Sequence, residues 1–237
     1  MPGILPGMLT ATQLAACTGA RIDRAQLFLA PLVDAMARYD IIGSARMSMF
    51  LPNIGHESLG FSRLVESLNY SADALIQKFS RERISKADAL LFGRTDSHAA
   101  NQAEIANRIY GGTWGRVNLG NTLPDDGWRF RAHGPMQTTG RANFVALTAR
   151  LRVRFPDLPI PDFVAKPELL TEPVWGALAS ADYWDMRGLN GWADKDDFDG
   201  VCDLINRGKK TAAEGDTNGW SDRVRLLAAA RKALGVV

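Results

Sequence analysis

The stretch GHESLGFSRLVESLNY, residues 55–70, constrains this chain most, because it places Glu57 and Glu66 on either side of Gly60. In one continuous helix, at about 100° per residue, the two side chains would point to opposite faces. They can face each other only if the chain turns between them, and glycine readily adopts the backbone conformations of a tight turn. We therefore predict a helix that ends near Glu57, followed by a turn at Gly60.

Two carboxyl groups that face each other can act as one acid and one base, which is the minimum equipment for breaking a glycosidic bond. Glu57 follows His56 and precedes an apolar stretch, and desolvation there would favour a protonated acid. Glu66 has polar neighbours, which favour an ionised base. The alternative is a pair of ordinary surface carboxylates, the usual fate of glutamate.

The composition is that of a globular protein that needs no covalent staples. The chain has 237 residues, 46% of them hydrophobic, enough for one large domain or two small lobes around a cleft. We expect a flexible lead-in over residues 1–9, where proline and glycine alternate, and a single catalytic domain over residues 10–237. A net charge of +2 gives no reason to expect a nucleic-acid partner. Cys17 and Cys202 show no metal spacing, so we expect unpaired core thiols, with one disulfide as the alternative.

The sequence predicts neither a membrane span nor a signal peptide. No apolar run approaches the roughly 18 residues of a membrane span, so we expect no stable membrane insertion. No lysine or arginine precedes the segment LAAC at 14–17, which argues against a signal peptide.

Hydrophobic periodicity and capping residues predict a mainly α fold with a small extended element over Phe61–Tyr70. We expect a turn over Tyr39–Met47 and an irregular segment over Thr113–Gly134. The predicted helices are: from Thr10 or Thr12 to Cys17, around 25–36, Ser48–His56, Ser71–Phe79, Lys86–Phe92, Asp96 or Ser97 to Tyr110, Thr139 or Gly140 to before Pro156, Val174–Trp184, Asp196–Asn206 and Ser221–Leu234.

Two polar segments follow the glutamates. The run WRFR at 128–131 alternates aromatic rings with arginines, and such a strip can stack on sugars and donate to their hydroxyls. A structural loop held by cation–π contacts is the alternative. The run QTTG at 137–140 offers Thr139, whose hydroxyl can hold a water or can cap the next helix.

Several ordered motifs together resemble glycoside hydrolase family 19, which holds plant-type chitinases and many phage endolysins. They are HES at 56–58, AN at 106–107, YGG at 110–112, GN at 120–121, DGWRFR at 126–131, QTTGRANF at 137–144, LINRG at 204–208 and SDRVRLL at 221–227. The short form resembles the phage endolysin branch, and the resemblance implies a two-lobed, lysozyme-like helical fold.

The resemblance implies a role for individual residues. Glu57 would be the general acid, Glu66 the base that activates water, and Thr139 would help to position that water. Arg223 would pair with the glutamates; since an arginine favours a charged carboxylate, we expect it to serve the base or to move during turnover. The expected substrate contacts are Gln137, Asn143, Asn206, Arg223, Tyr110 and Arg129.

This chain departs from the family pattern at three points. AHGPM stands where the family usually has a GRG-like run, Arg207 follows Asn206 in place of glycine, and Glu66 lies closer to Glu57 than in plant chitinases. The shorter gap is similar to that of the wider lysozyme superfamily.

The implied activity is inverting hydrolysis of β-1,4 bonds in peptidoglycan by a monomer that is made in the host cytoplasm and reaches the wall through a holin. A chitinase and a non-catalytic wall-binding module are the alternatives. We expect no cofactor and no metal, because the three histidines share no ligand spacing and Phe198 interrupts the acidic run at 194–199.

Overall fold

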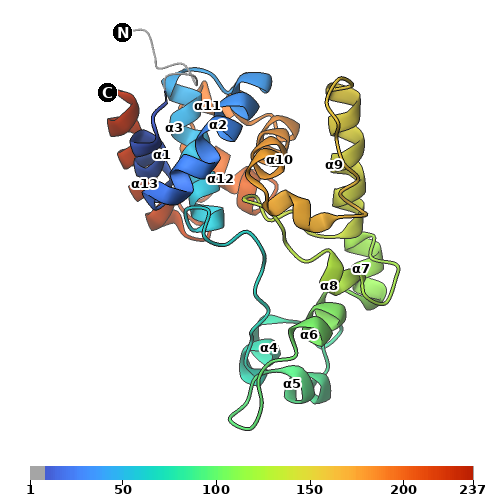
Figure 1. Cartoon of the computed structure of the whole chain (residues 1–237). Helices are drawn as coiled ribbons and strands as arrows, with labels where there is room; N and C mark the ends of the chain where they lie inside the picture. The colour runs from blue at the N-terminus through green and yellow to red at the C-terminus, as the bar shows by residue number, and fades with distance from the viewer. Residues whose placement is uncertain (1–8, 237) are drawn as a thin grey trace. The chain divides into compact units, whose positions relative to one another are not determined.

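The computed structural model describes residues 9–236, and its regular secondary structure is almost entirely helical (Figure 1). The prediction of a mainly α fold is confirmed. Within the described residues, β pairing is limited to isolated bridges, which join Val65 to His133, His133 to Thr138 and Ser71 to Arg94. The small extended element predicted beside Glu66 is reduced to such bridges. Of the predicted lead-in, residues 1–8 lie outside the described residues.

The chain divides into two compact units. Unit 1 comprises the described residues up to Leu64, Gly134–Met136 and the residues from Leu170 on; unit 2 comprises Val65–His133 and Gln137–Leu169. Unit 1 contains α1 (Ala11–Thr18), α2 (Ile22–Arg38), α3 (Gly43–Ser58), α10 (Pro173–Met186), α11 (Leu189–Ala193), α12 (Phe198–Asn206) and α13 (Trp220–Leu234). Unit 2 contains α4 (Ala72–Lys78), α5 (Lys86–Phe92), α6 (Gln102–Ile109), α7 (Gly112–Leu119), α8 (Asp126–Arg129) and α9 (Arg141–Arg154). A single catalytic domain over residues 10–237 stays a prediction.

In unit 1 the first and last helices of the chain pack together. Helices α1, α3 and α13 contact one another, and α2 packs against α10 (Figure 1). At Gly55 a Cβ atom would lie 2.3 Å from the carbonyl oxygen of Thr18, so the backbones of α1 and α3 touch there. Phe50 of α3 meets the buried Trp184 of α10 edge to face, with ring centroids 5.3 Å apart. This packing fixes the C-terminal end of α3, where Glu57 lies.

In unit 2 the short helices α4, α5 and α6 enclose a separate apolar core, and α8 packs on α6. Its buried members are Leu68, Leu75, Ile84, Ala89, Ile105, Ala106 and Ile109. Leu68 comes two residues after Glu66, so this core anchors the segment that carries the second glutamate.

Side-chain caps explain which helix starts were predictable. Thr10, Ser71 and Ser85 each accept a hydrogen bond from a backbone N–H in the first turn of the helix that follows, at α1, α4 and α5. The bounds predicted for these helices agree closely with the structure.

Other boundaries were wrong. Helix α3 begins at Gly43, inside the predicted turn Tyr39–Met47. Helix α6 begins at Gln102, because Asn101 accepts the backbone N–H of Glu104, and residues 95–98 instead close a turn. Helices α7 and α8 occupy the segment Thr113–Gly134 that was predicted to be irregular, and α11 was not predicted. Gly115 shows why: a Cβ there would lie 1.9 Å from the carbonyl oxygen of Tyr110, so this glycine lets α7 pack closely against the backbone that ends α6.

Cys17 and Cys202 are separate buried thiols. Within residues 9–236, no helix is both long and apolar enough to cross a bilayer.

Candidate active site

The turn predicted at Gly60 is present and tightly built. Glu57 lies in the last turn of α3, after which Leu59, Gly60 and Phe61 all adopt positive φ angles of 49°, 60° and 61°. Phe61 is fully buried and stacks on Phe28 with ring centroids 4.3 Å apart. Positive φ is costly for residues with a Cβ, so the packing of Phe61 must hold this turn in place. The chain therefore leaves α3 in a fixed direction directly after the first glutamate.

Replacing Gly60 with Ala should destabilise the protein more than positive φ alone explains. The new Cβ would lie 2.7 Å from Ala20 Cα and 2.9 Å from Ala20 N, where only backbone movement can relieve the overlap. The control is Gly188→Ala, since Gly188 has a φ of 63° and no atom within 4 Å of the added Cβ. We expect Gly188→Ala to cost about 1–2 kcal/mol and Gly60→Ala clearly more, measured by urea unfolding. Equal costs would show that the contact with Ala20 is unimportant.

The carboxylate of Glu57 forms an ion pair with Arg223 of α13, through Oε1 and Nη2. Arg223 is 1% exposed; its Nη1 donates to Asn53 Oδ1 and its Nε to the carbonyl oxygen of Asn218, at 3.1 Å. The Glu57 side chain remains 25% exposed, and Oε2 has no hydrogen-bond partner within residues 9–236. A buried guanidinium with three defined acceptors fixes one oxygen of Glu57 and leaves the other available.

The structure thus pairs Arg223 with the predicted acid. We expected Arg223 either to stabilise the charged base or to move during turnover. Because Arg223 pairs with the predicted acid, movement is the expectation that agrees with the structure. Asn53 was not predicted as a site residue. Its spacing of four residues from Glu57 on one helix was the available signal.

His56, next to Glu57, is fixed by a separate carboxylate. Its Nδ1 lies 2.7 Å from Oδ2 of Asp222 on α13, and this contact with His56 is the main reason that the pKa of Asp222 lies below its ordinary value. Gly219 fits beside the ring, because a Cβ there would lie 2.2 Å from His56 Cε1. The first turn of α13 therefore holds two consecutive residues of α3.

Glu66 belongs to unit 2, where Tyr110 holds it. The Tyr110 hydroxyl donates to Oε1 and Oε2, at 2.8 and 3.0 Å. The backbone N–H of Glu66 donates to the carbonyl oxygen of Ala132 at 2.9 Å, beside the bridge between Val65 and His133. Burial, followed by the charge of Glu66, raises the pKa of Tyr110, so the phenol stays protonated and can donate. Tyr110 was predicted to contact substrate; in the structure it binds the predicted base.

Arginines and aromatic rings surround this part of unit 2. The guanidinium of Arg83 lies 3.8 Å from the ring centre of Trp114 and 5.6 Å from that of Tyr110. Burial lowers the pKa of Arg83, while the charges of Tyr110 and Glu66 oppose that shift. Arg83 was missed because it is far from the motifs in sequence, whereas Trp114 lies two residues after the YGG motif, which was the available signal.

Within the WRFR strip the arginines make structural contacts. Arg131 lies 3.6 Å from the ring centre of Trp128 and donates to its carbonyl oxygen at 2.7 Å. Arg129 donates to the carbonyl oxygens of Val164 and Ala165, at 2.9 and 2.8 Å. These contacts favour the alternative of a cation–π-laced loop, and contact of Arg129 with substrate stays a prediction.

The turn that carries Thr139 is held from within. Thr139 Oγ1 donates to the carbonyl oxygen of Gln137 at 2.9 Å, and Asn143 Nδ2 donates to the carbonyl oxygen of Thr139 at 2.7 Å. The N-cap of α9 is Gly140, so the alternative that Thr139 caps this helix is wrong. A hydroxyl that donates its hydrogen in this way retains lone pairs that can accept from a water.

The predicted site residues fall into two groups. Unit 1 holds Glu57, Asn206 and Arg223, and unit 2 holds Glu66, Tyr110, Arg129, Gln137, Thr139 and Asn143. In unit 1, Asn206 Oδ1 accepts from the backbone N–H of Asn218 at 3.4 Å, and the Asn218 carbonyl in turn accepts from Arg223.

The contact between Tyr110 and Glu66 gives a direct test. Tyr110→Phe keeps the ring but removes the only donor group on it, so Glu66 should lose its fixed orientation. We expect kcat on glycan substrate to fall by roughly 10-fold, from a hydrogen bond to a charged group worth about 1.5–3 kcal/mol, most of which acts in the transition state. Tyr39→Phe, which removes a tyrosine hydroxyl that donates to Asp182 in unit 1 rather than to a glutamate, is the matched control. An unchanged kcat in Tyr110→Phe would remove Tyr110 from the site.

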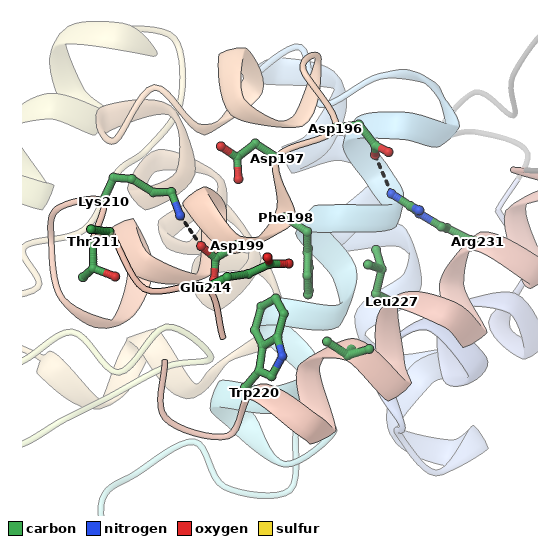
Figure 2. Close-up of a pocket in the computed structure, with 12 residues that line it drawn as sticks. Asp196, Asp197, Phe198, Asp199, Lys210, Thr211, Glu214, Trp220, Leu227 and Arg231 are labelled. Carbon is green, nitrogen blue, oxygen red and sulfur yellow. Dashed lines mark hydrogen bonds and ion pairs between the residues drawn. The ribbon is translucent and has the colours of Figure 1, made fainter. Parts of the chain in front are cut away.

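A cavity of about 530 Å³ opens on unit 1, and none of the predicted site residues lines it (Figure 2). Two of its acidic side chains are engaged in ion pairs: Asp196 pairs with Arg231, and Asp199 pairs with Lys210. Trp220 packs between Phe198 and Gly215, with a ring distance of 5.9 Å to Phe198. Residues of the loop 207–219 line another part of the cavity: Lys210, Thr211, Ala212 and Glu214. Within residues 9–236 no group of His, Cys, Asp or Glu side chains could hold a metal ion.

Comparisons with known proteins agree with this architecture. No family model matches the chain. A glycosyl hydrolase family 19 domain-containing protein of Haemophilus influenzae is 36% identical over 105 residues, which are 44% of this chain and 48% of that protein. The predicted resemblance to glycoside hydrolase family 19 is thereby confirmed. The chain spans about half the length of this relative.

Solved structures share the fold. Chitinase C from Streptomyces griseus HUT6037 superposes with a TM-score of 0.55 at 15% identity, over 96% of this chain and 77% of that chain. A mutant of chitinase C superposes with a TM-score of 0.56 at 14% identity and the same coverage. The helical, chitinase-like fold predicted from the motifs is therefore confirmed.

Proposed function

We propose that the chain is a glycoside hydrolase that cuts β-1,4 bonds between the N-acetylated sugars of peptidoglycan, with Glu57 as acid and Glu66 as base. One observation carries the proposal: each glutamate is held by a partner of its own, the buried Arg223 for Glu57 and the partly buried Tyr110 for Glu66. Surface carboxylates without a function have no need of such partners. The family 19 relative supports the reaction class.

The chemistry follows from how each carboxyl group is held. Arg223 occupies Oε1 of Glu57, so Oε2 would carry the proton to the leaving oxygen. As the acid must be protonated when it acts, Arg223 would shift once substrate is bound, from the ion pair to a hydrogen bond on Oε1 that leaves the proton on Oε2. Donation from Tyr110 favours the charged form of Glu66, which a general base requires. Thr139 would hold the attacking water.

We propose inversion at the anomeric carbon, with carboxyl groups about 6.5–9.5 Å apart in the substrate complex. Proton NMR of a digest should show the α anomer first, because the bond cut is β. Initial formation of the β anomer would contradict an inverting mechanism. Mass spectrometry of the reducing-end sugar in the same digest would identify the bond that is cut.

The biological role in the proposal is lysis of a host bacterium by a phage endolysin. A monomer made in the host cytoplasm would reach the wall through a holin. The substrate would be the glycan strands, with no nucleic acid, cofactor or stable membrane insertion involved.

A chitinase is the second candidate, because the solved structures that share the fold are of chitinase C. The two candidates differ in the polymer. The purified chain should clear a suspension of Gram-negative cells stripped of their outer membrane and release little sugar from chitin oligomers. Rapid release from chitin oligomers without loss of turbidity would favour the chitinase.

A further inference from the structure

The loop 207–219, between α12 and α13, is folded around a buried carboxylate. Asp203 of α12 has no exposed surface. Its Oδ1 accepts from Thr217 Oγ1 at 2.8 Å, and its Oδ2 accepts from the backbone N–H of Thr211 at 2.8 Å and from Thr211 Oγ1 at 3.1 Å. Lys210 Nζ lies 3.4 Å from the same oxygen. All of these donors belong to the loop, so Asp203 determines the path of the chain between the two helices.

Asp203 is ionised at neutral pH. Burial alone would raise the pKa of its carboxyl, but the hydrogen bonds from Thr211 and Thr217, with the charge of Lys210, outweigh burial and lower it. A charged acceptor makes these hydrogen bonds strong. A buried carboxylate of this kind is costly unless its donors stay in place, so the loop has one favoured conformation.

The loop continues directly to the Glu57 site. Thr217 precedes Asn218, whose carbonyl oxygen accepts from Arg223 Nε at 3.1 Å. Arg223 then binds Asn53 and the carboxylate of Glu57. An unbroken series of contacts within unit 1 therefore runs from Asp203 through Thr217, Asn218 and Arg223 to Glu57.

We propose that Asp203, acting through Thr217, is a positioning residue for the Glu57 carboxyl group. It places the Asn218 carbonyl, which orients the guanidinium of Arg223, which in turn orients Glu57. The kinetic part of this inference rests on the proposed function; the structural part does not.

Other contacts hold the loop 207–219 without reaching Asn218, and they allow positioning of Arg223 to be distinguished from general support of the loop. Asp199 pairs with Lys210 and accepts the backbone N–H of Gly215 at 2.8 Å, on the side of the loop that faces the cavity (Figure 2). Thr211 likewise binds Asp203 but lies far along the loop from Asn218. Loss of the Thr211 hydroxyl should loosen the loop without moving the carbonyl that Arg223 uses.

The test compares Thr217→Val, Thr217→Ser and Thr211→Val in the full chain. Thr217→Val keeps the shape but loses the donor to Asp203, whereas Thr217→Ser retains it. The first readout is hydrogen exchange of the Arg223 Nε–H by ¹⁵N NMR, which requires no activity. We expect exchange to be at least 10-fold faster in Thr217→Val, and unchanged in Thr217→Ser and Thr211→Val.

The second readout is turnover of the glycan. Thr217→Val should lower kcat about 10-fold with KM within about twofold, and Thr217→Ser should restore it. Unchanged Arg223 exchange in Thr217→Val would overturn the positioning role. So would equal effects of Thr217→Val and Thr211→Val on exchange, since that is the result of a merely structural loop. An inactive wild-type chain that shows the expected exchange pattern would instead overturn the proposed function.

Discussion

Glu57→Gln should abolish the proposed hydrolysis of peptidoglycan, with a loss of roughly 10²–10⁴-fold in kcat, because an amide cannot give a proton to the leaving oxygen. The substitution keeps the size of the side chain, and the amide oxygen can still accept from Arg223. Binding to insoluble wall material should therefore be retained. The measurement pairs a turbidity assay with sedimentation of wall-bound protein.

The matched control is Glu214→Gln, a glutamate of the same unit that is exposed and forms no ion pair within the described residues. It should retain full activity. Undiminished lysis by Glu57→Gln would refute the assignment of the acid. If the wild-type chain bound the wall without hydrolysing it, the alternative of a non-catalytic wall-binding module would stand instead.

Among the substitutions at the Glu57 site, Arg223→Met should lower the free energy of unfolding most. The substitution retains an apolar stem of similar length but removes the buried guanidinium, leaving the Glu57 carboxylate and the Asn53 and Asn218 oxygens without their donor. Breaking a buried ion pair by removing one partner costs about 3–5 kcal/mol. We expect the low end of that range, because Glu57 is 25% exposed and water can replace part of the interaction. Urea unfolding of the variant and the wild type gives the difference.

A double-mutant cycle shows whether this loss comes from the pair itself. Once Glu57 is already Gln, Arg223→Met removes no charge partner, so its cost should be smaller by about 0.5–3 kcal/mol. Additive losses in Glu57→Gln/Arg223→Met would mean that Arg223 stabilises the fold independently of the Glu57 charge, through packing and its hydrogen bonds to Asn53 and Asn218.

Local signals account for what could be predicted from the sequence. The turn after Glu57 followed from Gly60, and the start of α4 followed from Ser71, a serine cap that acts within a few residues. Helices α7 and α8 were missed because their glycines pack against neighbouring backbone, which sequence patterns do not distinguish from loops. A glycine in a loop and a glycine packed inside a helix look alike in the sequence, and only tertiary contacts distinguish the two.

Predictions for the site were limited in the same way. Glu57 and Arg223 were named together from motifs, and the structure pairs them. The contact of Tyr110 with Glu66 joins residues 44 apart in sequence, and neither periodicity nor capping encodes such a pairing. The distance between the Glu57 and Glu66 carboxyl groups stays a prediction.

The packing of α13 against α1 and α3 bears on when the protein acquires activity during its synthesis. Arg223 is supplied by the last helix, more than 160 residues after Glu57. A chain still being translated has already made the acid but not the guanidinium that binds it, and α3 lacks one of its neighbours, α13, until residues 220–234 leave the ribosome. The Glu57 carboxylate should therefore gain its guanidinium partner only once residues 220–234 have been synthesised, so that shorter nascent chains lack the ion pair that orients the proposed acid.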